Sequence, residues 1–144
     1  MASTVTILLD ALIAALRTGG AFADVGLSPA GNATAVPRAS VCLDGTETFA
    51  SDDVAGETWC RARVTVDVHT RDTDAGQAVR RLQTLLDAAE AALLVDPSQG
   101  GLCRALPVGQ ATEIVSRQLS PAVHRPQAAA TLSVRCHFVS TGGA

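Results

Sequence analysis

The residues whose side chains could do chemistry are few and widely spaced in this sequence. The chain contains no pair of histidines four positions apart and no Cys-x-x-Cys pair among its histidines and cysteines, which are His69, His124, His137, Cys42, Cys60, Cys103 and Cys136. Structural zinc sites and dithiol redox sites need such short spacings. We therefore expect surface histidines, buried free thiols and no metal site.

The familiar signatures of enzymes are also missing. Cys136 and His137 are adjacent, but neighbours in a strand point to opposite faces and cannot easily form a nucleophile and base pair. There is no G-x-S-x-G motif, and a phosphate-binding loop ending in Gly-Lys is impossible because the sequence has no lysine. We predict a non-enzymatic protein without a cofactor, and an unrecognised enzyme or small-ligand domain stays open as an alternative.

The patterns of charge and hydropathy argue against binding to DNA and against insertion into a membrane. The formal net charge is -3 and the basic residues are single except for Arg80-Arg81, so no basic cluster predicts DNA binding. The apolar stretch from Thr6 to Leu16 contains Asp10 and has about half the length that a bilayer span needs. The neutral start at Met1 is typical of a helix cap and not of a signal peptide. We expect no membrane span and a protein that is intracellular when made.

Two amphipathic helices are expected, because apolar residues recur twice at three- and four-residue steps. The first stripe follows a Ser-Thr cap and stops at a Gly-Gly pair. The second begins behind Asp72 or Thr73 as cap and stops before Asp96-Pro97, where proline disfavours a helix. The predicted ranges are about Thr4 to Thr18 and about Asp74 to Leu94.

Strict alternation of apolar and polar residues predicts two long strands, each with one buried face. The first runs from Glu57 to Thr70 and the second from Ala128 to Val139, with His137 on its outward face. Shorter extended segments are expected at Ala21–Val25, Ala39–Leu43, Leu102–Val108 and Ala111–Leu119.

The order of these elements predicts an α+β fold. A helix, two or three strands, a long helix and two or three more strands can form a mostly antiparallel sheet with two helices packed on one face. The length of 144 residues fits one domain, residues 1–144, with flexible ends at about 1–3 and 140–144. Residues 44–56 are expected to form an exposed acidic loop, because they carry four carboxylates and almost nothing apolar except Phe49.

Trp59 directs attention to a candidate interface. It begins the first long strand on an otherwise polar face, where a large apolar side chain would be exposed unless a loop of this chain or a neighbouring subunit covers it. Arginines on the same face could make charge-assisted contacts across an interface or remain solvated. The candidate interface residues are Trp59, Arg61 and Arg63 of this strand, with Asp44, Glu47, Phe49, Asp52 and Asp53 of the acidic loop.

A resemblance rests on the second half of the chain. A long strand is followed by the helix from Asp74 to Leu94 and then by Val95-Asp96-Pro97-Ser98-Gln99-Gly100-Gly101-Leu102. This arrangement resembles small neck and tail proteins of long-tailed bacteriophages, in particular the tail terminator (tail completion) family. Members of that family are expected to have an amphipathic first helix, a sheet, and a helix ending in a DP-x-x-GG turn, in which Ser98-Gln99 stands here for a Thr-Leu pair.

The resemblance implies a structural role in the tail or neck of a virion. Subunits of the tail terminator family assemble as hexameric rings that cap the tail tube. The partners that the resemblance implies for this chain are therefore further copies of itself, the tail tube protein and the head connector or neck proteins. DNA would pass through the lumen without specific binding, and an acidic loop at the lumen or at an inter-subunit seam would let it slide. The subunit would be made in the bacterial host cytoplasm and belong to a phage or a phage-derived particle such as a gene transfer agent. A neck protein just below the portal and a cytoplasmic binding module unrelated to phage stay open as alternatives.

Overall fold

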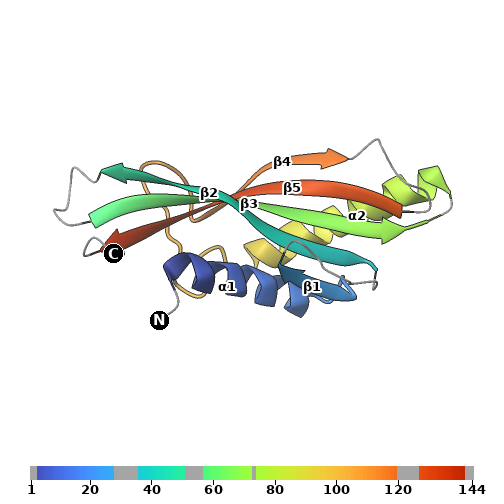
Figure 1. Ribbon diagram of the computed structural model, residues 1–144, viewed down its shortest axis with the longest axis horizontal. Coiled ribbons are helices and arrows are strands. Elements are labelled where there is room, and N and C mark those ends of the chain that lie inside the picture. Colours follow the sequence, from blue (N-terminus) through green and yellow to red (C-terminus); the bar gives the residue numbers. More distant parts are fainter. Residues whose placement is uncertain (1–2, 28–35, 51–56, 73, 120–126, 142–144) are drawn as a thin grey trace.

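Two helices and five strands make up the part of the chain that the computed structural model describes, residues 3–27, 36–50, 57–72, 74–119 and 127–141 (Figure 1). In chain order they are α1 (Thr4–Gly19), β1 (Asp24–Leu27), β2 (Arg38–Ala50), β3 (Glu57–Arg71), α2 (Ala75–Leu94), β4 (Thr112–Leu119) and β5 (Gln127–Thr141). The strands form one sheet in the order β1-β2-β3-β5-β4, antiparallel except for β1 beside β2. The predicted α+β fold with a mostly antiparallel sheet is confirmed.

Both helices pack on the sheet face that the alternation predicted to be buried. Val64 and Val66 of β3 and Leu132 of β5 are at most 1% exposed on this inner face, beneath the apolar stripes of α1 and α2. The helices also meet each other closely, because a Cβ built on Gly19 would lie 3.0 Å from the Cβ of Ala92. The two layers of the fold are therefore one sheet and one pair of helices.

Local capping fixes where the helices begin and end. The Ser3 hydroxyl accepts a hydrogen bond from the Thr6 amide at 3.2 Å, and Gly20 ends α1 in the left-handed conformation with φ 74°. The cap of α2 is Asp74, whose carboxylate accepts from the Gln77 amide at 3.1 Å, and not Asp72 or Thr73 as predicted. Asp72 instead accepts a bond from the backbone amide of Asp74 at 3.0 Å, which orients that cap.

A well-bonded turn follows α2 at the segment that carries the resemblance. The Asp96 carboxylate accepts bonds from the Ser98 hydroxyl at 2.6 Å and from the amides of Gly100 and Ser98, and these bonds lower the pKa of Asp96. The buried side chain of Gln99 donates to the Leu93 carbonyl at 2.8 Å and so closes the end of the helix. Gln99 has a φ of 48° and Gly100 one of 74°, a conformation that the glycine adopts without strain.

The expected acidic loop over residues 44–56 is wrong in its first half. Residues 44–50 belong to β2 and pair with β3, with Glu47 opposite Arg61 and Phe49 opposite Trp59. A β-bulge between Leu43 and Gly45 interrupts the alternation, and the inner-face side chain Thr46 is exposed because no helix covers it. Residues 51–56, which include Asp52 and Asp53, lie outside the described part of the chain.

Three other boundaries differ from the prediction. Residues 102–108 form no strand, and their one β-bridge is an isolated pairing of Leu106 with Gly109. The first strand is Asp24–Leu27 instead of Ala21–Val25. Ser140 belongs to β5, where it pairs with Thr58, and Ser3 caps α1, so neither is part of a tail. The remaining end residues, 1–2 and 142–144, lie outside the described residues.

Candidate interaction surface

The outer face of the sheet, opposite the helices, brings most of the predicted interface residues together. They lie toward the end of the sheet where β2, β3 and β5 run side by side beyond β1 and β4, with Arg63 level with the first residues of β4 (Figure 1). We call this group the outer-face cluster; it consists of Glu47, Phe49, Trp59, Arg61, Arg63 and His137. Asp44 is exposed at the β2 bulge, next to the cluster.

Arg61 is the centre of the outer-face cluster. Its guanidinium donates to Nε2 of His137 at 3.0 Å and to the Val108 carbonyl at 3.0 Å. It also lies 3.5 Å from the Glu47 carboxylate and 5.0 Å from the centre of the Phe49 ring. Because the side chain is only 18% exposed, these partners replace most of its water and hold the guanidinium in one orientation.

His137 is the residue for which the sequence prediction fails most clearly. It was expected on the surface, yet it is fully buried. Its backbone amide and carbonyl bond to Ala111 and Arg104, so the segment before β4 runs alongside β5 and covers the ring. Nothing in the local alternation of β5 reveals this cover, because it comes from residues distant in the sequence.

The two ring nitrogens of His137 have partners of opposite kinds. Nδ1 faces the Gln110 carbonyl, which only accepts, while Nε2 faces the Arg61 Nε–H, which only donates. The neutral imidazole with its proton on Nδ1 satisfies both. Gly109 packs against this ring so closely that a Cβ there would overlap it, which explains a glycine at this position. The two hydrogen bonds of the ring and the close packing of Gly109 therefore hold this group in one arrangement.

Around the covered pair of Arg61 and His137, the other side chains of the cluster remain partly open to solvent. Trp59 is half-buried between Phe49 and Val139, which lie directly opposite it on the two neighbouring strands. Neighbours within the sheet thus supply part of its cover. The Arg63 side chain is 51% exposed and lies 3.3 Å from Glu47, which it shares with Arg61.

The four cysteines are free, and two of them form a buried pair that their distant sequence positions did not reveal. The Cys103 thiol hydrogen-bonds to Cys136, which lowers the pKa of Cys136, helped by the Thr112 hydroxyl. The same bond, together with burial, raises the pKa of Cys103. Burial also raises the pKa of Cys60. The described residues contain no group of three or more His, Cys, Asp or Glu side chains that could hold a metal ion.

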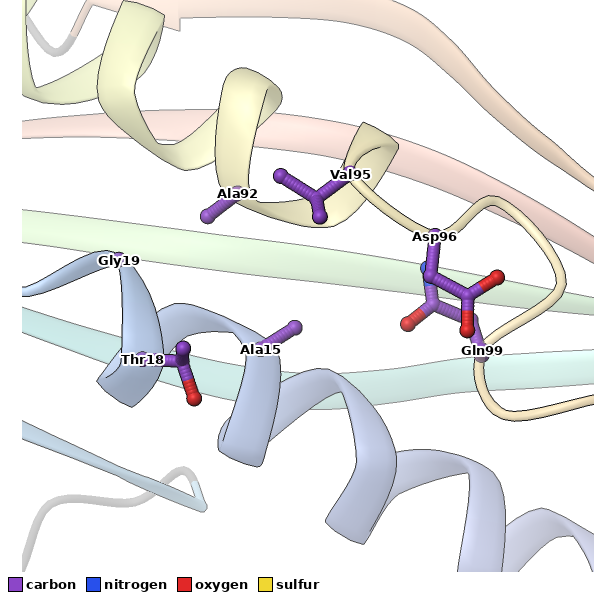
Figure 2. A pocket seen from close by; sticks show the side chains of 7 residues that line it. All are labelled: Ala15, Thr18, Gly19, Ala92, Val95, Asp96 and Gln99. Atoms are coloured by element: carbon purple, nitrogen blue, oxygen red, sulfur yellow. The ribbon is translucent and has the colours of Figure 1, made fainter.

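A small hollow lies between the ends of the two helices (Figure 2). Its volume is about 290 Å³, at the lower limit for a small-molecule pocket, and its lining residues are Ala15, Thr18, Gly19, Ala92, Val95, Asp96 and Gln99. Val95 on its rim is 84% exposed. Among the helices of the described residues, none is long and apolar enough to cross a membrane.

Comparison with solved structures finds similar chains, one of them in a virion. No family model matches the chain, and no curated protein matches it. The chain is similar to a chain of the virion of a native gene transfer agent particle, with a TM-score of 0.44 and 14% sequence identity over 87% of this chain and 84% of that one. Values this low establish neither a common fold nor a common function.

Proposed function

We propose that this chain is a non-enzymatic structural subunit of a phage or phage-like particle. In this proposal its copies form a ring, hexameric as in the tail terminator family that the sequence resembles. The ring ends the tail tube and joins it to the head connector, and DNA passes through the lumen without specific binding. The chain is then a component of the virion and does its work through shape and contact.

The outer-face cluster is the observation that supports an assembly role. Arginine and aromatic side chains are enriched in protein interfaces and carry much of their binding energy. Here Trp59, Phe49 and Arg61 are gathered at one end of the outer sheet face, where Arg61 is held by its bonds to His137 and the Val108 carbonyl and by its contact with Phe49. A partner would therefore meet a surface that needs little ordering on binding. His137, the histidine of this cluster, is committed to two hydrogen bonds, which agrees with a structural role for the cluster.

Incorporation into particles tests this proposal. The Arg63→Glu variant reverses an exposed charge of the cluster and should reduce the amount of the chain in purified particles at least tenfold. Arg81→Glu is the matched control, because the Arg81 side chain is 54% exposed and also faces one carboxylate, Asp72 at 3.7 Å, on α2. Electron microscopy with a labelled chain should place the unaltered protein at the head–tail junction. A label elsewhere in the particle, or equal incorporation of both variants, would contradict the proposal.

A further inference from the structure

Half of β2 has an open edge. β1 pairs with β2 only from Arg38 to Val41, whereas β2 continues to Ala50. We call Cys42–Ala50 the free half of β2; on its side away from β3, no strand of the described residues pairs with it (Figure 1). An unpaired edge presents a row of backbone donors and acceptors on which another strand can add.

The opposite edge of the sheet is open as well. β4 (Thr112–Leu119) pairs with β5 on one side and, within the described ranges, with no strand on the other. Neither β4 nor the free half of β2 contains a proline, one of the features that protect such an edge. Each edge also exposes an apolar side chain, Leu43 at 36% and Val115 at 44%. Pairing through these edges would cover both side chains.

The two edge strands, β2 and β4, run in directions that allow antiparallel pairing between neighbouring copies. β2 is antiparallel to β3, β3 to β5, and β5 to β4, so β2 and β4 run in opposite directions. If neighbouring copies are related by rotation about an axis roughly along the strands, each strand keeps its direction. The free half of β2 in one copy then meets β4 of the next copy in the antiparallel sense.

The two edges are also displaced relative to each other along the strand direction, as the edges of a sheet that closes into a ring are. Through β3, the free half of β2 aligns with Ser133–Ser140 of β5, whereas β4 aligns with Ala130–Cys136. The offset is thus 133 − 130 = 3 residues at one end and 140 − 136 = 4 at the other, roughly 10–13 Å at the rise of a strand. A stagger between the edges of a sheet is what tilts its strands when the sheet closes on itself.

We infer that the free half of β2 binds β4 of a second copy of this chain, so that one sheet continues from subunit to subunit. The inference rests on the proposed function, since it names the contact that closes the ring. Such head-to-tail contacts can repeat around a rotation axis. Pairing of two β2 edges with each other would also be antiparallel, but it would stop at a dimer and leave β4 unused.

Disulfide trapping tests the contact with a cysteine that the protein already has. Cys42 lies on the outer face of the free half of β2, in the same row of the sheet as Ser116 of β4, while the other three cysteines are buried. Under mild oxidation, Ser116→Cys or Gln118→Cys should give a ladder of covalent species beyond the dimer on non-reducing gels. Adding Cys42→Ser should abolish the ladder, and Thr84→Cys on the exposed side of α2 should give none. A wild-type chain that links only into Cys42 dimers would overturn the inference in favour of the two-β2 arrangement.

Hydrogen exchange gives a second readout that does not depend on register. In the assembled state, amides of both the free half of β2 and β4 should exchange at least tenfold more slowly than in the monomer. Rings seen by native mass spectrometry without this protection would overturn the edge contact and leave the proposed function standing. A chain that stays monomeric and is also absent from particles would overturn both.

Discussion

Replacing Arg61 should destabilise the protein far more than replacing its neighbour Arg63. Arg61→Ala removes the donor from two acceptors, the buried Nε2 of His137 and the Val108 carbonyl, each worth at least about 1 kcal/mol when left unsatisfied. It also removes a cation–π contact with Phe49 worth about 0.5–1 kcal/mol. The expected loss in the free energy of unfolding is about 3 kcal/mol.

Urea denaturation measures this loss, followed by the fluorescence of Trp59, the single tryptophan, and by circular dichroism. With a slope of about 2 kcal/mol per molar urea, the midpoint should fall by about 1.5 M. Arg63→Ala is the control, because its exposed ion pair with Glu47 contributes no more than about 0.5 kcal/mol. If the two variants unfold at midpoints closer than about 0.3 M, then Arg61 is not the centre of a buried network and the reasoning is refuted.

Three further changes test other parts of the structure. Gly109→Ala should cost about 1–3 kcal/mol in unfolding free energy and lower the melting temperature, because the new Cβ overlaps the His137 ring. Thr112→Val should cost about 1–3 kcal/mol in urea unfolding, because its buried hydroxyl donates to a carbonyl at 2.6 Å. Asp96→Asn should destabilise the protein at neutral pH but not in acid. The pKa of Asp96 in the folded state lies below its ordinary value of 3.8. The ionised carboxylate therefore stabilises the fold above that value, and this stabilisation is lost as the pH falls through the folded-state pKa. Unfolding curves of both proteins from about pH 7 to about pH 2 should therefore converge, and a constant difference would contradict this account.

The parts of the fold that follow a regular period were predictable from the sequence. β3 and β5 each have one face under the helices, so valine, alanine and cysteine alternate with polar residues along them. Both helices keep an apolar stripe for the same reason, and the ends of α1 follow from Ser3 and Gly20. In these elements the local pattern and the tertiary environment agree.

Residues 44–50, which make up most of the free half of β2, were not predictable in this way. A strand alternates between apolar and polar residues only where another layer of the fold buries one of its faces. Here no such layer covers the inner face, and its side chains Thr46 and Thr48 are exposed. The bulge beyond Leu43 also shifts the faces by one residue. With polar residues on both faces, a strand held only by β3 has the composition of a loop.

For the candidate interface, the individual residues were predictable from the sequence and their contacts were not. Trp59, Arg61, Arg63, Glu47 and Phe49 could be selected from the sequence as unusual residues, but the network that joins them could not. Its centre depends on His137, whose polar type and outward position in the alternation indicate a surface residue. The segment before β4 reverses that assignment by bonding to both sides of the His137 backbone.

The same arrangement links the stability of the fold to the surface that we propose for assembly. The segment that covers His137 leads directly into β4, the strand whose open edge we expect to meet the next copy. Arg61 ties this segment to β3 through the Val108 carbonyl and approaches Glu47 on β2, the strand with the other open edge. A weakened Arg61 network should therefore alter the relative position of both edges, so the Arg61→Ala variant should assemble less well even under conditions in which it remains folded. Arg81→Ala, on α2 and outside the outer-face cluster, leaves that network intact and should preserve assembly, which makes the pair of variants a test of whether this bonding and subunit contact are coupled.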